Sequence, residues 1–203
     1  VQPLTSHNHL GKYSLAHNGN LHIETEHDTT YFIRFINHSK KNTWKDILID
    51  LLDSIPGVYC LLILTCDGIY GIRDKYGVRP LVIGNTGNDF CFSSESCAFH
   101  RYNFYQNVNA GEIYLLNGTM CEHIHTDNKY LSKNNNICSF EYIYFLRANS
   151  IVDDISVEVI RSKLGEALAK RDKNQHTFDK NSSDLVVIGI PDSGLLAAKS
   201  YAN

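Results

Sequence analysis

The sequence has 203 residues, of which 43% are hydrophobic and 20% charged, and its formal net charge is −3. This composition is typical of a globular protein, and the weak negative charge argues against nucleic acid or an anionic membrane as the main partner. The longest apolar run, residues 58–64, is too short to span a bilayer, and no signal peptide is apparent. The six cysteines have no C-x-x-C spacing, so we expect buried free thiols in a reducing, cytoplasmic compartment.

The first residues have the pattern of a loop, and a buried strand is expected next. The segment YSLAHNGNLHI at 13–23 predicts a strand that turns sharply at Asn18-Gly19, because Asn-Gly is a common turn dipeptide. The polar residues at this point have a second interpretation, since an Asn side chain and a neighbouring backbone N–H can together stabilise an oxyanion. A plain turn is the simpler interpretation, and the wall of a site is the alternative.

Two helices are predicted after this strand. DTTYFIRFINH at 28–38 begins with Asp28 in the N-cap position, although a carboxylate there could instead hold a substrate ammonium group. The second helix covers 43–55 and is ended by Pro56-Gly57. Its apolar residues share one face at helical spacing: Trp44, Ile47, Leu48, Leu51, Leu52 and Ile55.

Three hairpins and a short helix complete the first part of the chain. Pairs of strand-like segments flank Cys66-Asp67-Gly68, residues 85–88 and Asn117-Gly118. A short helix is expected after Ser96. Residues 1–137 are therefore predicted to form an α+β domain with antiparallel strands.

The pattern changes near residue 138, where we place a domain boundary. An amphipathic helix is predicted at 156–171, and a polar connector follows at 171–183. Residues 184–202 predict a strand, a polar turn and a helix, the unit that opens parallel α/β domains. The predicted helix at 156–171 places four apolar residues on one face: Val157, Ile160, Leu164 and Leu168.

The polar turn at 191–194 is a second candidate site. It precedes a helix N-terminus, where backbone N–H groups and the helix dipole favour phosphate. A loop in which Asp192 or Ser193 caps the helix is the simpler interpretation. Its position directly after an apolar strand favours a binding site.

Over the whole chain, the order of short motifs resembles the amidophosphoribosyltransferase family. Related amidotransferases share the first motifs, whereas the block FEYIYF distinguishes this family. The matching motifs are, in order, VQPL, LAHNGNL, GIYGIRDKYGVRPLVIG, SSESCAF, AGE, ICSFEYIYFLRANS and IGIPDSGLLAA.

This resemblance implies an α+β fold with two parts. Residues 1–137 would be an Ntn-hydrolase αββα sandwich with antiparallel sheets that hydrolyses glutamine, and residues 138–203 the start of an α/β phosphoribosyltransferase domain. The side chain of Asn18 and the N–H of Gly19 would form an oxyanion hole, and Asp28 would bind the glutamine α-amino group. The loop residues that would face the pyrophosphate of phosphoribosyl pyrophosphate (PRPP) are Asp192, Ser193 and Gly194.

The implied reaction transfers ammonia from glutamine to PRPP and gives 5-phosphoribosylamine, the first step of de novo purine synthesis. Glutamine and PRPP would be the small-molecule partners, without nucleic acid or membrane, and the full-length protein would be a homo-oligomer. The family also implies Mg²⁺, with ligands outside this chain. Cys138 matches a cysteine that ligates an iron–sulfur cluster in some members, but no other candidate ligand is recognisable, so we expect a buried thiol instead.

Departures from the family pattern leave a second hypothesis open. The family's N-terminal cysteine nucleophile and its carboxylate-binding arginine would precede Val1, and the PRPP fingerprint would follow Asn203. We therefore expect a fragment that is inactive by itself. The connection between Leu21 and Asp28 is also shorter than in the family, which is compatible with a non-catalytic relic or regulatory protein that retains the fold.

Overall fold

The structure, a computed structural model, describes residues 1–21, 27–85, 87–99, 104–127, 136–175 and 185–203. It divides into two compact units, Val1–Ile137 and Cys138–Asn203. This division falls where the pattern of the sequence also changes. Each unit is described below by itself.

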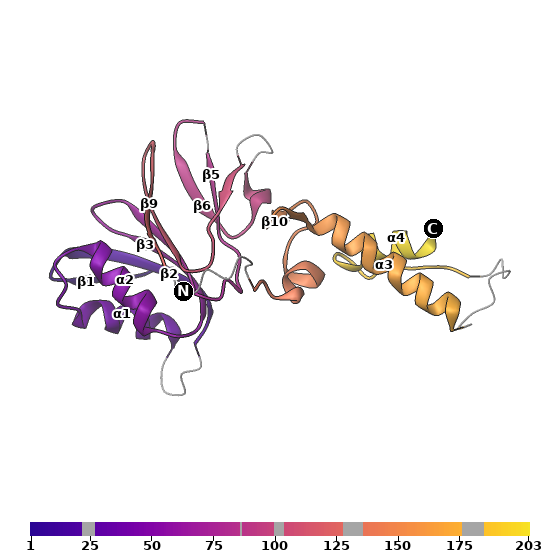
Figure 1. Cartoon of the computed structure of the whole chain (residues 1–203), viewed down its shortest axis with the longest axis horizontal. Helices are drawn as coiled ribbons and strands as arrows, with labels where there is room; N and C mark the ends of the chain where they lie inside the picture. Colours follow the sequence, from indigo (N-terminus) through magenta and orange to yellow (C-terminus); the bar gives the residue numbers. More distant parts are fainter. Residues whose placement is uncertain (22–26, 86, 100–103, 128–135, 176–184) are drawn as a thin grey trace. The chain divides into compact units, whose positions relative to one another are not determined.

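A six-stranded antiparallel sheet forms the centre of the first unit (Figure 1). Its strand order is β1-β2-β3-β4-β8-β9, and every neighbouring pair is antiparallel. The strands are β1 (Leu4–Asn8), β2 (Gly11–Asn20), β3 (Val58–Leu64), β4 (Ile69–Arg73), β8 (Glu112–Asn117) and β9 (Met120–Thr126).

Two helices cover one face of this sheet, as Figure 1 shows. They are α1 (Asp28–His38) and α2 (Trp44–Ser54), and the Thr43 hydroxyl caps α2 by accepting from the N–H of Asp46 at 3.1 Å. Their apolar residues and alternate sheet residues such as Leu15 and Leu61 form the main core. The predicted apolar face of α2 is confirmed, since all six of its members are buried: Trp44, Ile47, Leu48, Leu51, Leu52 and the C-cap residue Ile55.

A second, three-stranded antiparallel sheet packs on the opposite face of the first. It contains β5 (Val82–Asn85), β6 (Phe90–Ser93) and β7 (Phe104–Asn107), with β5 in the middle, and a 3₁₀ turn, η1 (Ser96–Ala98), follows β6. Cys60 and Leu116 of the six-stranded sheet share a buried cluster with Leu81 and Ile83, which lie in and beside β5. The predicted α+β class with antiparallel sheets is confirmed, although no α-helix among the described residues of this unit forms a second helical layer.

The local turn signals were good guides to the hairpins. β3 pairs with β4 around Cys66-Asp67-Gly68, and β8 pairs with β9 around Asn117-Gly118, both as predicted. The β5–β6 hairpin is also present, although residue 86 of its turn lies outside the described residues. The prediction of a loop at the N-terminus was wrong, because β1 pairs with β2.

A buried arginine holds the segment that follows β4. Arg73 is fully buried and donates to three backbone carbonyl oxygens: Nε to Arg79 at 2.7 Å, Nη1 to Val108 at 2.7 Å and Nη2 to Gly77 at 2.9 Å. Planar guanidinium groups suit such divergent acceptors, and each hydrogen bond to a charged donor is stronger than a neutral one. Arg73 therefore joins the end of β4 to the loops before β5 and after β7.

Asp74, the next residue, binds backbone N–H groups, whereas Arg73 binds backbone carbonyl oxygens. Asp74 is buried and accepts from the backbone N–H groups of Tyr76 at 2.7 Å, Gly77 at 3.1 Å and Tyr59 at 3.2 Å. Burial raises the pKa of Asp74, and the hydrogen bonds from these N–H groups oppose that shift. Asp74 thereby connects the turn after β4 to the start of β3.

The second unit is built on two helices. It begins with a π-helical turn, Glu141–Phe145 (η4), and a two-residue hairpin, β10 (Ile151–Val152) and β11 (Ile155–Ser156), before α3 (Val157–Asn174) and α4 (Gly194–Ala202). The helices approach closely at Gly165, where a Cβ would lie 2.1 Å from the carbonyl oxygen of Ala197.

The buried face of α3 differs from the predicted one. Val157, Arg161 and Gly165 are buried at intervals of four residues, whereas Leu164 and Leu168 are 40% and 41% exposed. Arg161 donates to the carbonyl oxygens of Tyr142 at 2.8 Å and Leu146 at 2.7 Å. The backbone hydrogen bonds and the close helix contact determine this face, and simple apolar spacing does not.

The strand predicted at 184–190 was also wrong for the residues that are described. Residues 185–190 have no strand assignment, and Ile188 and Ile190 are 81% and 80% exposed. A strand requires a neighbour for its backbone hydrogen bonds, and no described strand pairs with this segment. Residues 171–174 of the predicted polar connector belong to α3, and residues 176–183 lie outside the described residues.

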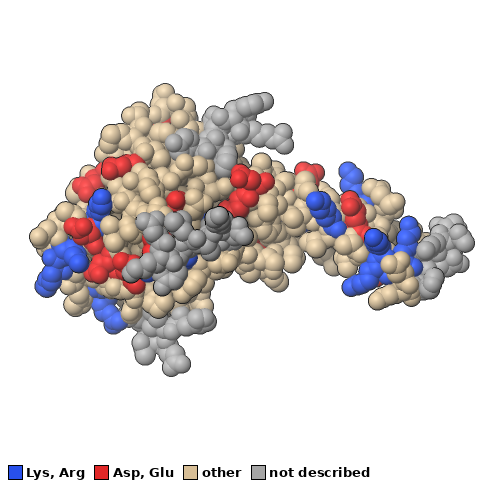
Figure 2. Space-filling view, in the orientation of Figure 1, with Lys and Arg blue, Asp and Glu red and all other residues tan. Residues whose placement is uncertain are grey.

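Charges of both signs are distributed over the surface. Figure 2 shows acidic and basic side chains near one another on the visible face of the first unit. Among the described residues, no helix combines the length and apolarity needed to cross a bilayer.

Replacing Arg73 by alanine should strongly destabilise the first unit. The variant leaves three carbonyl oxygens without their donor, and each buried unsatisfied group costs about 1–3 kcal/mol. We expect the free energy of unfolding to fall by roughly 3 kcal/mol or more. Denaturant unfolding followed by the fluorescence of the single tryptophan, Trp44, measures this, and Lys12→Ala on the exposed end of β2 is the control. A loss no larger than that of the control would contradict the role of Arg73.

Candidate functional site

Asn18 and Gly19 lie inside an extended strand, so the predicted sharp turn at this dipeptide was wrong. β2 continues to Asn20, with Asn18 opposite Cys60 and Gly19 opposite Tyr59 of β3. Pairing with β3 overrides the local turn preference of Asn-Gly. The two residues therefore stand on a sheet, a more rigid support than a turn.

Gly19 is required by the close approach of the two strands. A Cβ at this position would lie 2.0 Å from the carbonyl oxygen of Val58 and 2.6 Å from the Cα of Tyr59. No side chain fits at those distances, so glycine is needed for the pairing of β2 with β3.

The alternation of side chains along β2 separates a core face from a site face. Tyr13 and Leu15 are buried under the helices, whereas Asn18 and Asn20 belong to the opposite set and are exposed. Cys60, the partner of Asn18, belongs to the cluster between the two sheets. Asn18 thus lies on the face of the sheet that carries the second sheet, and its side chain reaches solvent.

Asp28 is placed one residue away from its predicted N-cap position. The N-cap of α1 is His27, whose side chain caps nothing, and Asp28 is the first helical residue. Its Oδ2 accepts from the backbone N–H of Leu21 at 2.7 Å. The carboxylate thereby joins the end of β2 to the start of α1. The shortened connection that the sequence shows between them falls on residues 22–26, outside the described residues.

His17 is a fourth residue at this end of β2, and sequence reasoning missed it. Its ring packs against Phe32 of α1 with a centroid distance of 5.3 Å. Burial lowers the pKa of His17, and the negative charge of Asp28 opposes this shift. The structure therefore places His17 and Asp28 where β2 meets α1, whereas the side chain of Asn18 lies on the opposite face of the sheet. The signal available in the sequence was the position of His17 directly before Asn18.

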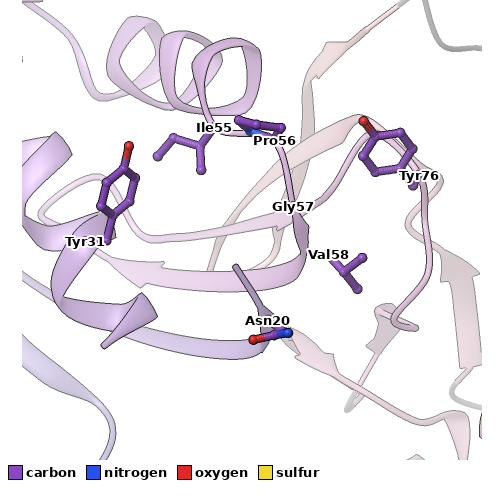
Figure 3. A pocket seen from close by; sticks show the side chains of 7 residues that line it. All are labelled: Asn20, Tyr31, Ile55, Pro56, Gly57, Val58 and Tyr76. Atoms are coloured by element: carbon purple, nitrogen blue, oxygen red, sulfur yellow. The ribbon is translucent and has the colours of Figure 1, made fainter. Parts of the chain in front are cut away.

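A hollow of about 470 Å³ opens at the end of β2, where Asn20 is one of its lining residues (Figure 3). This volume is within the usual range for small-molecule sites. Asn20 of β2 and Tyr31 of α1 line it, whereas the predicted site residues Asn18 and Asp28 do not. Its lining residues are Asn20, Tyr31, Ile55, Pro56, Gly57, Val58 and Tyr76.

The second candidate site, in the second unit, lies at the N-terminus of α4. Asp192 is exposed, Ser193 precedes the helix without capping it, and Gly194 is its first residue. The N–H of Gly194 donates to the carbonyl oxygen of Ile190 at 3.0 Å. The three predicted residues thus form one turn at a helix N-terminus, a location that favours phosphate groups.

The cysteines differ from the expectation of buried thiols. Cys60 is buried, whereas Cys66 and Cys138 are exposed and the other three are intermediate. Among the described residues, no group of three or more His, Cys, Asp or Glu side chains is arranged to hold a metal ion. Within that part of the chain no companion ligands surround Cys138, and its metal role stays a prediction.

Comparison with known proteins gives the context of this geometry. A glutamine amidotransferase domain family matches residues 1–101. The whole chain is 34% identical to the amidophosphoribosyltransferase of Bacillus subtilis and 30% identical to that of Archaeoglobus fulgidus. It is 33% identical to the chloroplastic amidophosphoribosyltransferase of Vigna aconitifolia. It covers 44%, 46% and 43% of their respective lengths, so the chain spans less than half of these relatives.

Two solved structures resemble the fold over the entire chain. One is the glutamine PRPP amidotransferase of B. subtilis complexed with ADP and GMP, with a TM-score of 0.78, 34% identity and 46% of that chain covered. The other is described as the allosteric regulatory enzyme of purine biosynthesis, with a TM-score of 0.80, 34% identity and 45% covered.

The fold, the Asn-Gly strand and the domain match define the first unit as a glutamine amidotransferase domain. The similarity to amidophosphoribosyltransferases covers all 203 residues and therefore includes both units.

Gly19→Ala should disrupt the site strand. The added methyl group would lie 2.0 Å from the Val58 carbonyl oxygen, and the backbones must separate to admit it. We expect a loss of at least about 3 kcal/mol in the free energy of unfolding. Gly87→Ala is the matched control, because it has open space and only an unfavourable φ of +106°, which costs about 1 kcal/mol. Equal losses in the two variants, measured by Trp44 fluorescence, would refute the close approach.

His17 should make the first unit less stable in mild acid. Because the folded state lowers the pKa of His17 below 6.5, the unfolded chain takes up a proton more readily. Its contribution is therefore complete above about pH 6.5 and is lost as the pH falls toward the folded-state pKa. Denaturant unfolding between pH 5 and pH 8 should show a smaller pH dependence in His17→Phe than in the unmodified protein. The exposed His7→Phe is the control, and an unchanged slope in His17→Phe would contradict the assignment.

Proposed function

We propose that the protein to which residues 1–203 belong hydrolyses glutamine and transfers the ammonia to PRPP, giving 5-phosphoribosylamine in the first step of de novo purine synthesis. The observation that carries this proposal is the position of Asn18 and Gly19 near the end of β2. Asp28 joins this end to α1, and Asn20 of the same strand lines a hollow of about 470 Å³. The similarity of the whole chain to amidophosphoribosyltransferases supports the same reaction.

The site chemistry follows from Asn18, Gly19 and Asp28. The side-chain N–H of Asn18 and the backbone N–H of Gly19 stabilise the oxyanion that forms when a thiolate attacks the glutamine amide. One such donor contributes about 2.7–4 kcal/mol to the transition state. Asp28 offers its second carboxylate oxygen to the α-ammonium group of glutamine.

The nucleophile is the N-terminal cysteine that the family resemblance implies. None of the six cysteines, at positions 60 to 138, carries a free α-amine to serve as its own base. A polypeptide of residues 1–203 alone is therefore expected to release no ammonia, and the tests of activity use the natural protein.

The second half-reaction takes place at the other unit. Asp192, Ser193 and Gly194 face the pyrophosphate of PRPP, where the N-terminus of α4 favours negative charge. Mg²⁺ would neutralise the leaving pyrophosphate, and its ligands are expected outside this chain. The proposed protein is cytoplasmic and homo-oligomeric.

A non-catalytic relic is the second candidate function. The departures of the sequence between Leu21 and Asp28 favour it, together with the use of one Asp28 oxygen for the Leu21 N–H. It predicts that the natural protein does not bind glutamine. Ammonia release from glutamine by that protein would exclude it.

Asn18→Ala should lower turnover in the natural protein. Since the oxyanion exists only in the transition state, we expect kcat to fall about 10²–10³-fold while KM for glutamine changes little. Coupled assays of ammonia and phosphoribosylamine measure both values, with the exposed Asn42→Ala as the control. An active enzyme whose turnover is unchanged by Asn18→Ala would refute the oxyanion assignment, and an inactive natural protein would favour the relic.

A further inference from the structure

The two edges of β2 are used differently. On one edge, residues 14–20 pair with β3. On the other edge, β1 pairs only with residues 11–15. No described strand pairs with residues 16–21 on this second side, which we call the open edge of β2.

Side chains take the place of the missing strand at two positions. The backbone N–H of His17 donates to the Oε1 of Gln2, and the N–H of Leu21 donates to the Oδ2 of Asp28 at 2.7 Å. Gln2 lies just before β1, and Asp28 is the first residue of α1. The open edge is therefore fastened to a different neighbouring element at each end.

Gly19 lies midway between these two attachments. Backbone N–H groups of a strand point alternately to its two edges, so residues 17, 19 and 21 direct theirs to the same side. The N–H of Gly19 therefore points to the open edge, and the acceptors supplied by Gln2 and Asp28 serve the residues on either side of it. This N–H is the backbone donor that the proposed oxyanion hole requires.

We propose that Gln2 and Asp28 are positioning residues that hold the open edge of β2 on both sides of Gly19. Part of this inference rests on the proposed function, namely the use of the Gly19 N–H as an oxyanion donor. An edge without a partner strand tends to fray or to pair with another chain, and either event would misdirect this N–H. Two side-chain acceptors fix the edge without covering its centre. Catalysis by a backbone donor depends on such preorganisation.

The arrangement gives Asp28 two separable tasks. Its Oδ2 binds the Leu21 N–H, which leaves Oδ1 for a substrate ammonium group. The first task needs only an acceptor oxygen, whereas the second needs a negative charge. Asparagine at this position keeps the acceptor and removes the charge, so Asp28→Asn distinguishes them.

Amide hydrogen exchange resolved to single residues tests the attachments directly in the natural protein. Gln2→Ala should speed exchange at His17 about tenfold and leave Leu21 unchanged, whereas Asp28→Ala should do the reverse. Gln2→Glu and Asp28→Asn should keep exchange close to that of the unmodified protein, because each retains an acceptor oxygen. Thr5→Ala, which removes the hydroxyl contact with Ser14 at 2.9 Å on the same pair of strands, is the matched control.

Unchanged exchange at both amides in the alanine variants would overturn the proposal. So would an Asp28→Asn variant whose Leu21 amide exchanges as fast as in Asp28→Ala. The exchange rates are measured without glutamine and without turnover, so they test the two attachments independently of the proposed function.

Kinetics then test what the attachments are for. Gln2→Ala should lower kcat about tenfold with little change in KM, since Gln2 contacts no substrate in the proposed mechanism. Asp28→Asn should raise KM and largely preserve kcat, whereas Asp28→Ala should affect both. Unchanged kcat in Gln2→Ala, with faster exchange at His17, would reject the role in catalysis. A natural protein without glutaminase activity would refute the proposed function and leave the two attachments in place.

Discussion

The pairing of β2 with β3 at Gly19 is the contact on which the candidate site depends. The two backbones approach so closely that a Cβ would lie 2.0 Å from the Val58 carbonyl oxygen. The same pairing sets the direction of every neighbouring group, because side chains and N–H groups alternate along a strand. A larger residue at position 19 would therefore redirect the Asn18 side chain and the Gly19 N–H together.

Buried polar groups hold β3 in the position that this pairing requires. Across the sheet, Asn18 is opposite Cys60, and Cys60 is opposite Arg73 of β4. Asp74 binds the N–H of Tyr59, the residue that pairs with Gly19. Burying an arginine and an aspartate is costly unless their hydrogen bonds are complete, and both sets are extensive here. The geometry of the site is thus linked to a network in the core more than fifty residues away along the chain.

The features predicted correctly are those that local sequence determines. The apolar face of α2 follows from helical spacing, and the hairpins follow from turn residues between strand-like segments. The errors at Asn18-Gly19 and Asp28 have a common cause, because each residue's conformation depends on a partner that local sequence does not reveal. For Asn18-Gly19 this partner is β3, and for Asp28 it is the N–H of Leu21 at the end of β2. Asn-Gly forms a turn only when no other strand pairs with it, and β3 does so here. The roles of Gln2 and His17 could not be predicted for the same reason. Gln2 accepts from the N–H of His17, and the ring of His17 packs on Phe32, so both partners are distant in the sequence.

The second unit shows the same limit of local information, because its helices were predicted correctly and its strand was not. Helices α3 and α4 contain their own backbone hydrogen bonds, and the Ser156 hydroxyl caps α3, so local sequence suffices to form them. Residues 185–190 have the apolar pattern of a buried strand, but a strand exists only with a neighbour. In the conformation described, the carbonyl oxygen of Ile190 instead accepts from the N–H of Gly194. That N–H is one of the groups proposed to bind pyrophosphate, and in this conformation it is donated within the turn itself.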